Sequence, residues 1–151
     1  MKLNYLTTVA AILLAVFSTG CVNADEHRTY IDARSASDAD ALPFSGAVRI
    51  GDTLYLSGAL GLTDEGKVPD DPAEEARLVM DSIKETVEKA GMTMDDIVSV
   101  QVFCSDVSHY QAFNGVYRSY FTKEFPARAF IGSGTLLFNA RFEVQGIAVK
   151  R

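Results

Sequence analysis

Two ionisable residues near the C-terminus, Arg128 and Glu143, have the types and the setting for chemistry on a small anion. Arg128 follows Phe125-Pro126-Ala127 at the start of an otherwise apolar strand, where an unpaired guanidinium would be costly. It therefore has either an internal acidic partner or an anionic ligand. Glu143 lies on the final predicted strand, and we expect it to be the second ionisable group of the same region. A guanidinium can bind a carboxylate through two parallel hydrogen bonds, and a carboxylate can accept a proton from water.

Strand alternation assigns these residues to faces. Arg128, Phe130 and Gly132 share one face of their strand, because successive side chains point to opposite sides. On the final strand, Glu143 lies on the face opposite to Phe142. Each ionisable group is thus expected on a half-apolar strand, held in place by its apolar neighbours.

The residues before Arg128 predict the elements that must position it. Gly51-Asp52 joins two β-prone runs into a hairpin, and Asp71-Pro72 begins a helix that Gly91 ends. The remaining expected elements are a strand at 97–103, a helix at 110–121 and two terminal strands, and residues 29–31 are a candidate for one further strand before the hairpin. The order ββ-α-β-α-ββ predicts an α+β sandwich, with both helices on one face of a mixed β-sheet. The sheet's other, apolar face would stay bare, which implies association.

Charge and composition narrow the classes of partner. The 151 residues suffice for one domain and carry a net charge of −6, which argues against nucleic acid or an anionic membrane surface as a partner. The acidic run Asp64-Glu65, Asp70-Asp71, Glu74-Glu75 is expected to be a solvated loop and helix start. Cys104 is expected to be a small buried hydrophobe. His27 and His109 lack metal-ligand spacing, so no metal site is predicted.

From about Leu42 to Arg151 the chain resembles a known family. The matching segments, in order, are Pro43-Phe44, Gly51-Asp52-Thr53-Leu54-Tyr55-Leu56-Ser57-Gly58, Gly66-Lys67-Val68-Pro69, Ala90-Gly91, Asp96-Ile97-Val98, Val102-Phe103, Asn114-Gly115-Val116-Tyr117, Phe125-Pro126-Ala127-Arg128 and Ile147-Ala148-Val149-Lys150-Arg151. Their order and spacing are similar to those of the reactive intermediate deaminase (Rid) family of trimeric enamine and imine hydrolases.

The resemblance implies a chorismate-mutase-like fold, a homotrimer with its pockets between subunits, and no cofactor. It implies that Arg128 binds the carboxylate of a small 2-imino acid and that Glu143 orients or activates the hydrolytic water. The residues themselves leave alternatives open. Arg128 could form a structural salt bridge to Glu143 or another acid, and Glu143 could be a solvated residue paired with Arg141 or Lys150.

The resemblance extends to further substrate-binding positions. Ser57 and Gly58 match a strand end that lines the family's pocket, and Asn114 matches an asparagine at the trimer interface. Phe44 stands where a tyrosine hydroxyl often contacts the substrate, so one polar contact is lost. Phe130 replaces a frequent small cysteine on the Arg128 face and is expected to narrow or reshape the pocket. A further departure is Leu136-Leu137, where the family has Leu-Pro. These changes predict retained chemistry with a shifted substrate range.

The first 24 residues predict export. Lys2 precedes an apolar run over residues 6–17 and a small-residue region, the pattern of a signal peptide. Two cleavage readings remain open: acylation at Cys21 as a lipoprotein, or cleavage after Ala24 by signal peptidase. The protein would then be periplasmic or lipid-anchored in a bacterial envelope. Residues 25–41 are expected to form a linker or an N-terminal strand, and residues 42–151 the Rid-like domain.

Three functional hypotheses follow. The first is an exported homotrimeric deaminase that hydrolyses small 2-imino acids to 2-oxo acids and ammonia. The second is a trimeric module that binds a small carboxylate without turnover, which export favours because enzymes that generate such imines are mostly cytoplasmic. The third is a structural envelope subunit in which an arginine–glutamate pair only stabilises the trimer.

Overall fold

A computed structural model describes residues 28–151 of the chain. The predicted signal peptide, with its alternatives at Cys21 and Ala24, lies outside the described residues. The predicted strand at residues 29–31 is confirmed as β1, Arg28–Ile31, and a loop then leads to the next strand. No helix within residues 28–151 is long and apolar enough to cross a membrane.

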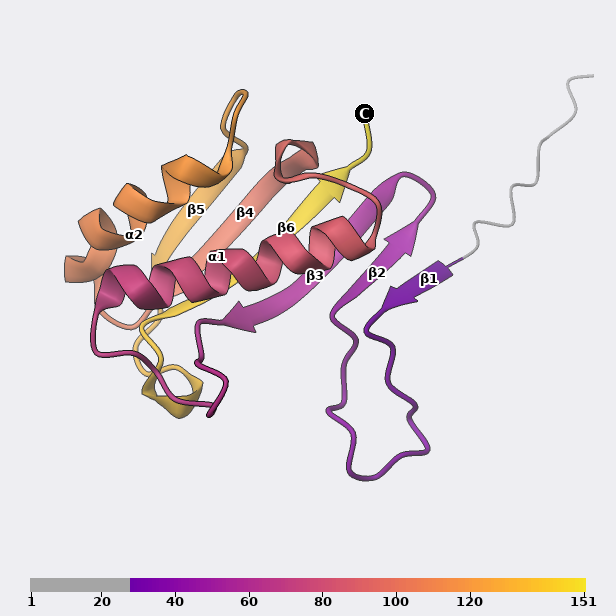
Figure 1. Ribbon diagram of the computed structural model, residues 1–151, viewed down its shortest axis with the longest axis horizontal. Helices are drawn as coiled ribbons and strands as arrows, with labels where there is room; N and C mark the ends of the chain where they lie inside the picture. Colours follow the sequence, from indigo (N-terminus) through magenta and orange to yellow (C-terminus); the bar gives the residue numbers. More distant parts are fainter. Residues whose placement is uncertain (1–27) are drawn as a thin grey trace, which may run out of the picture.

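One mixed sheet and two helices make up the described chain. The strands after β1 are β2 (Ala47–Ile50), β3 (Thr53–Leu60), β4 (Ile97–Cys104), β5 (Ala127–Gly132) and β6 (Phe142–Val149). The helices are α1 (Pro72–Lys89) and α2 (Tyr110–Tyr117). The strand order is β1-β2-β3-β6-β4-β5, and every pair is antiparallel except the parallel pair β4–β5. Both helices cover the same face of the sheet, as Figure 1 shows. The predicted α+β fold is therefore confirmed.

Local signals in the sequence explain where the first helix begins and ends. The Asp71 side chain accepts a hydrogen bond from the Ala73 N–H at 3.0 Å, and Pro72 occupies the first helical position. One face of α1 is then buried against the sheet, through Ala76, Val79, Met80, Ile83 and Val87. Gly91 follows the helix with φ of 70°, a value that glycine adopts without steric cost.

The second helix is shorter than predicted. α2 ends at Tyr117, and a 3₁₀ turn over Arg118–Tyr120 replaces the last α-helical turn. Two side chains bind carbonyls there: Arg118 Nε donates to the Asn114 carbonyl at 3.1 Å, and the Ser119 hydroxyl donates to the Val116 carbonyl at 2.7 Å. Such bonds offer the backbone an alternative to continued α-helix.

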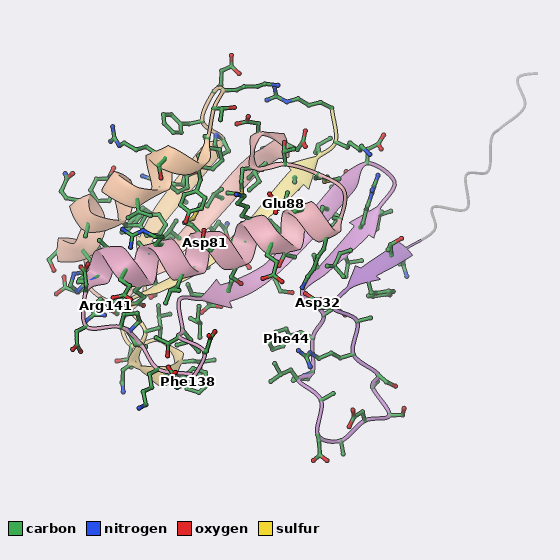
Figure 2. All side chains as sticks on the ribbon, viewed as in Figure 1. Asp32, Phe44, Asp81, Glu88, Phe138 and Arg141 are labelled. Atoms are coloured by element: carbon green, nitrogen blue, oxygen red, sulfur yellow. The ribbon has the colours of Figure 1, made fainter. Side chains whose placement is uncertain are left out.

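The prediction that the acidic run from Asp64 to Glu75 is solvated is wrong for Glu75. Its side chain is completely buried at the start of α1, where its carboxylate faces the beginning of β6. Oε1 accepts the backbone N–H of Arg141 at 2.5 Å and that of Phe142 at 3.1 Å. Oε2 pairs with Arg141 Nη1 at 2.8 Å. Glu75 therefore fixes the chain just before Glu143. Figure 2 shows Arg141 beside the first turns of α1.

The sheet face opposite the helices has no cover within the described chain. Phe142, Val144 and Ala148 of β6 are buried under the helices, so the alternate residues face outward. Exposed apolar residues on that outward face include Tyr55 at 49%, Ile131 at 38% and Val149 at 38%. We refer to it below as the open face. It is the bare apolar face that the element order predicts.

Candidate active site

Arg128 lies at the start of β5 on the helix-covered side of the sheet. Its guanidinium carbon is 4.5 Å from the ring centroid of Tyr117 and 5.9 Å from that of Tyr110, both on α2. Cation–π attraction can hold an arginine in this way without neutralising it. None of the ion pairs among residues 28–151 involves Arg128. The internal salt bridge that was the alternative reading of Arg128 is therefore absent from the described chain.

A cavity of about 260 Å³ opens beside this guanidinium. It is lined by Tyr110, Asn114, Tyr117, Arg118, Phe125, Pro126 and Arg128. The lining holds two guanidinium groups and no carboxylate, so the cavity is electropositive although the whole chain is acidic. Aromatic walls lower the local dielectric and strengthen the attraction between a guanidinium and an anion. The arrangement suits a small organic anion with an apolar portion.

Of two further residues predicted in the site, Asn114 lines the cavity and Phe130 does not. Asn114 lies on α2 and lines the cavity together with Arg128. Phe130 packs edge-on against Tyr110, with centroids 4.9 Å apart, and against Phe113 at 5.7 Å. It thus supports the Tyr110 ring and joins the edge of the core instead of lining the cavity. The centroid of the Phe130 ring is also 5.8 Å from the guanidinium carbon of Arg128.

Glu143 lies at the start of β6 on the open face, next to the end of β3. A β-bulge between Leu56 and Ala59 interrupts the pairing of β3 with β6 at this point. A Cβ placed on Gly58 would overlap the Glu143 carboxylate oxygen Oε1, so only glycine leaves room for that carboxylate. Glu143 pairs with neither of its two alternative partners: Arg141 pairs with Glu75, and the ion pairs of the described chain do not include Lys150.

Ser57 and Phe44 border the same strand end. The Ser57 hydroxyl donates to the Ser45 carbonyl at 2.7 Å, and its backbone N–H donates to the Gly46 carbonyl at 3.0 Å. Ser57 therefore ties the loop after β1 to β3. Phe44 lies on that loop and is 51% exposed, on the far side of α1 from α2 (Figure 2). The sequence-predicted residues thus form two groups: Arg128 with Asn114, and Glu143 with Gly58, Ser57 and Phe44.

The two groups do not meet within one protomer. Along β4, Arg128 is in register with Val100 and Glu143 with Phe103, on the two opposite neighbours of that strand. Three residues of strand and two strand spacings separate them by roughly 10 Å in each direction. Their side chains also point to opposite faces, Arg128 toward α2 and Glu143 toward the open face. The expectation that they share one region is therefore wrong for a single chain.

Sequence reasoning missed the aromatic half of the Arg128 cavity. Tyr110, Asn114 and Tyr117 recur at helical spacing on one face of α2, which is the signal that could have identified it. The Tyr117 ring also packs against Phe113 at 5.7 Å and Phe121 at 4.8 Å. Burial raises the pKa of Tyr117 to about 12, while the positive charge of Arg128 opposes that rise.

Comparison with known proteins assigns the chain to a family. Residues 35–150 match the profile of the family described as Endoribonuclease L-PSP. The chain belongs to this family. The resemblance to the Rid proteins expected from the sequence is thereby confirmed at the level of the family.

Two relatives of known name carry the deaminase description. The 2-iminobutanoate/2-iminopropanoate deaminase of the mite Dermatophagoides farinae is 37% identical over 110 residues, which cover 71% of this chain and 85% of that protein. The Escherichia coli K12 protein of the same name is 34% identical over 113 residues, which cover 72% of this chain and 88% of that protein.

Solved structures of similar proteins have the same fold. The Escherichia coli YjgF gene product is 31% identical, superimposes with a TM-score of 0.72, and is matched over 82% of this chain and all of that one (100%). Escherichia coli TdcF, solved with bound serine, is 25% identical with a TM-score of 0.72, over 82% of this chain and 100% of that one.

Proposed function

We infer that this L-PSP family protein is an enamine/imine deaminase that hydrolyses small 2-imino acids to 2-oxo acids and ammonia. The observation that carries this conclusion is Arg128, a guanidinium held by aromatic rings beside a cavity that contains no acid. A guanidinium in this setting can bind a carboxylate through two parallel hydrogen bonds. The relatives named 2-iminobutanoate/2-iminopropanoate deaminase support the reaction, and the serine bound to TdcF supports a small carboxylate as ligand.

The complete site is formed between subunits of a homotrimer. Arg128 and Glu143 lie on opposite faces of one sheet, so a second copy of the chain must bring its Glu143 to the first copy's Arg128 cavity. The open face supports this assembly, because its exposed apolar side chains need cover. Each site would then contain Arg128 and Asn114 of one protomer, with the partner's Glu143, Gly58, Ser57 and Phe44.

The chemistry requires only these residues and water. Arg128 binds the carboxylate of R–C(=NH)–COO⁻ and orients the imine carbon toward the partner's Glu143. Glu143 accepts one proton as water adds to that carbon, which gives a tetrahedral carbinolamine. Glu143 passes that proton to the former imine nitrogen, then takes the proton of the new hydroxyl group and delivers it to the same nitrogen. The C–N bond breaks as the hydroxyl oxygen becomes the carbonyl, and ammonia leaves together with the 2-oxo acid. No cofactor is needed, because the imine carbon is already electrophilic.

Hydrolysis of RNA, which the family description suggests, has less support in this chain. The net charge of −6 opposes association with a polyanion. The cavity beside Arg128, at about 260 Å³, suits a small molecule. A small-carboxylate-binding module without turnover uses the same cavity and is the alternative that the experiment below must separate.

The test is ammonia release from imines generated by an amino-acid oxidase, measured with and without the purified protein. We expect the protein to accelerate hydrolysis of 2-iminobutanoate well above the spontaneous rate. Arg128→Ala should lose about 2–5 kcal/mol of carboxylate binding, and Arg128→Lys should recover only part, because an ammonium lacks the planar fork. Glu143→Gln should keep carboxylate binding and lose turnover, since an amide cannot accept the proton of water.

Two results would contradict this assignment. Saturable 2-oxobutanoate binding without acceleration would select the binding module. Wild-type rates in Arg128→Ala would exclude the cavity as the site.

We also propose that the protein is exported, either to the periplasm or as a lipid-anchored envelope protein. The sequence of residues 1–24 supports this proposal. Mass spectrometry of the protein from its native cells tests it. Acylated Cys21 or a new N-terminus at Asp25 is expected, and an intact Met1 would contradict export.

A further inference from the structure

The hydroxyl of Tyr117 is an exception among the buried polar groups of the described chain. Tyr117 is only 5% exposed, and its Oη is the one buried side-chain nitrogen or oxygen within residues 28–151 that lacks a hydrogen-bond partner. Leaving such a group unpaired costs free energy, because it gives up its bonds to water on folding. A phenylalanine would fill the same core position without that cost. The hydroxyl therefore calls for a partner that the protomer alone does not supply.

The position of Tyr117 indicates what kind of partner that is. Tyr117 lines the Arg128 cavity, and its ring lies under the guanidinium at 4.5 Å. Phe113 and Phe121 pack against the ring and hold it in place. Because burial raises its pKa to about 12, the phenol keeps its proton at neutral pH and acts as a donor. A neutral donor is thus fixed beside a cation, with no acceptor assigned to either.

A second tyrosine nearby, Tyr120, has a hydroxyl that is paired within the protomer. The Tyr120 hydroxyl donates to Asp81 Oδ1 at 2.7 Å and also lies 3.1 Å from the Arg77 carbonyl, in the groove between α1 and α2. Tyr120 does not line the Arg128 cavity. Of these two tyrosines, three residues apart, the one that lines the Arg128 cavity has the unpaired hydroxyl.

We propose that the Tyr117 hydroxyl donates a hydrogen bond to the carboxylate that Arg128 binds. Tyr117 then has two functions at the site: its ring packs against the guanidinium of Arg128, and its hydroxyl donates a hydrogen bond to one oxygen of the carboxylate. The inference rests on the proposed function, because it assumes that the cavity takes the substrate's carboxylate. It adds a substrate-binding residue that neither the sequence motifs nor the ion pairs identify.

Tyr117→Phe tests the proposal, since it removes only the hydroxyl and keeps the ring under Arg128. The probe is 2-oxobutanoate, the stable product of 2-iminobutanoate hydrolysis, titrated by calorimetry. We expect its Kd to rise about tenfold, as for a lost hydrogen bond to a charged group. In the imine assay KM should rise by a similar factor with kcat nearly unchanged, because the bond is made in ground and transition state alike. The melting temperature should stay the same or increase.

Tyr120→Phe is the matched control and should leave the Kd for 2-oxobutanoate unchanged. A second measurement needs no substitution: in protein labelled with [ζ-¹³C]tyrosine, saturating 2-oxobutanoate should shift the Tyr117 resonance and leave that of Tyr120 in place. An unchanged Kd in Tyr117→Phe, or an unmoved Tyr117 resonance, would overturn the proposal. A lower melting temperature with unchanged Kd would overturn it too, and would assign the hydroxyl to a contact with another subunit.

These measurements distinguish the role of Tyr117 from the function proposed for the whole site. If Arg128→Ala weakens 2-oxobutanoate binding and Tyr117→Phe does not, only the role of Tyr117 is wrong. If the wild-type protein neither binds 2-oxobutanoate nor accelerates imine hydrolysis, the proposed function fails, and the role of Tyr117 fails with it.

Discussion

At the scale of the residue, Arg128 is a cation held, within the described chain, by aromatic rings instead of by an acid. Its guanidinium rests on the rings of Tyr117 and Tyr110, which attract it without consuming its hydrogen-bond donors. The sequence could identify Arg128 as unusual, because a lone arginine at the head of an apolar strand needs an explanation. It could not identify the rings, because α2 lies ten or more positions earlier in the sequence and only the fold brings it over β5.

Gly58 offers the sharpest prediction at this scale. In Gly58→Ala the added methyl group would overlap Glu143 Oε1, and the carboxylate can yield by moving because it is the end of a flexible side chain. We therefore expect a folded protein with a displaced carboxylate, whose kcat for imine hydrolysis falls at least about tenfold.

Gly115→Ala is the control for this substitution, since a Cβ at that position on α2 meets nothing within 4 Å. It should keep full turnover and gain about 0.5–1 kcal/mol of stability, because alanine is the better helix former. Equal loss of activity in both variants would show that Gly58→Ala does not act by displacing the Glu143 carboxylate.

At the scale of the element, the site depends on how α1 fixes the start of β6. The hairpin of β2 and β3, the two ends of α1 and the strand β4 were all predictable, because each has local turn, cap or alternation signals. The burial of Glu75 was not predictable, because an acidic residue in a first helical turn is usually solvated. Only the approach of β6 gives this carboxylate its two backbone donors and its arginine.

Arg141→Ala tests this link between the elements. It leaves the Glu75 carboxylate fully buried without its cation, which should cost about 3–5 kcal/mol of unfolding free energy. Urea denaturation at fixed protein concentration measures the loss. Lys84→Ala is the control, because its pair with Glu88 spans 3.8 Å between exposed side chains and should contribute less than about 1 kcal/mol. A similar loss of unfolding free energy in the two variants would mean that the buried Glu75–Arg141 pair stabilises the fold no more than an exposed pair does.

At the scale of the whole molecule, the main feature is the open face of the sheet, on which Glu143 lies. The order of elements already predicted a sheet with one bare side, and the open face confirms this prediction. The sequence did not predict that Arg128 and Glu143 lie on opposite faces of the sheet, although strand alternation placed each residue relative to its neighbours on its own strand. Strand order and register decide which faces coincide, and these come from pairings distant in sequence.

Tyr55→Glu tests whether the open face is an interface. Tyr55 is 49% exposed and neighbours Val48 and Ile147 on that face, so a buried carboxylate there would oppose assembly. Light scattering should show a trimer for the wild type and a monomer for the variant, which should also lose turnover. Gln111→Glu adds the same charge on an exposed part of α2 and should remain trimeric. A wild-type monomer at micromolar concentration would rule out the assembly.

Mixed trimers of Arg128→Ala and Glu143→Gln test the central claim most directly, because each variant alone should be inactive in imine hydrolysis. If a site combines Arg128 of one protomer with Glu143 of the next, every mixed trimer contains one interface with both residues intact. Random mixing of equal amounts should then restore about a quarter of the wild-type rate, since about three quarters of the trimers are mixed and each has one of three sites. If both residues acted within a single protomer, no mixture would recover activity. Inactivity of verified mixed trimers would therefore contradict the account.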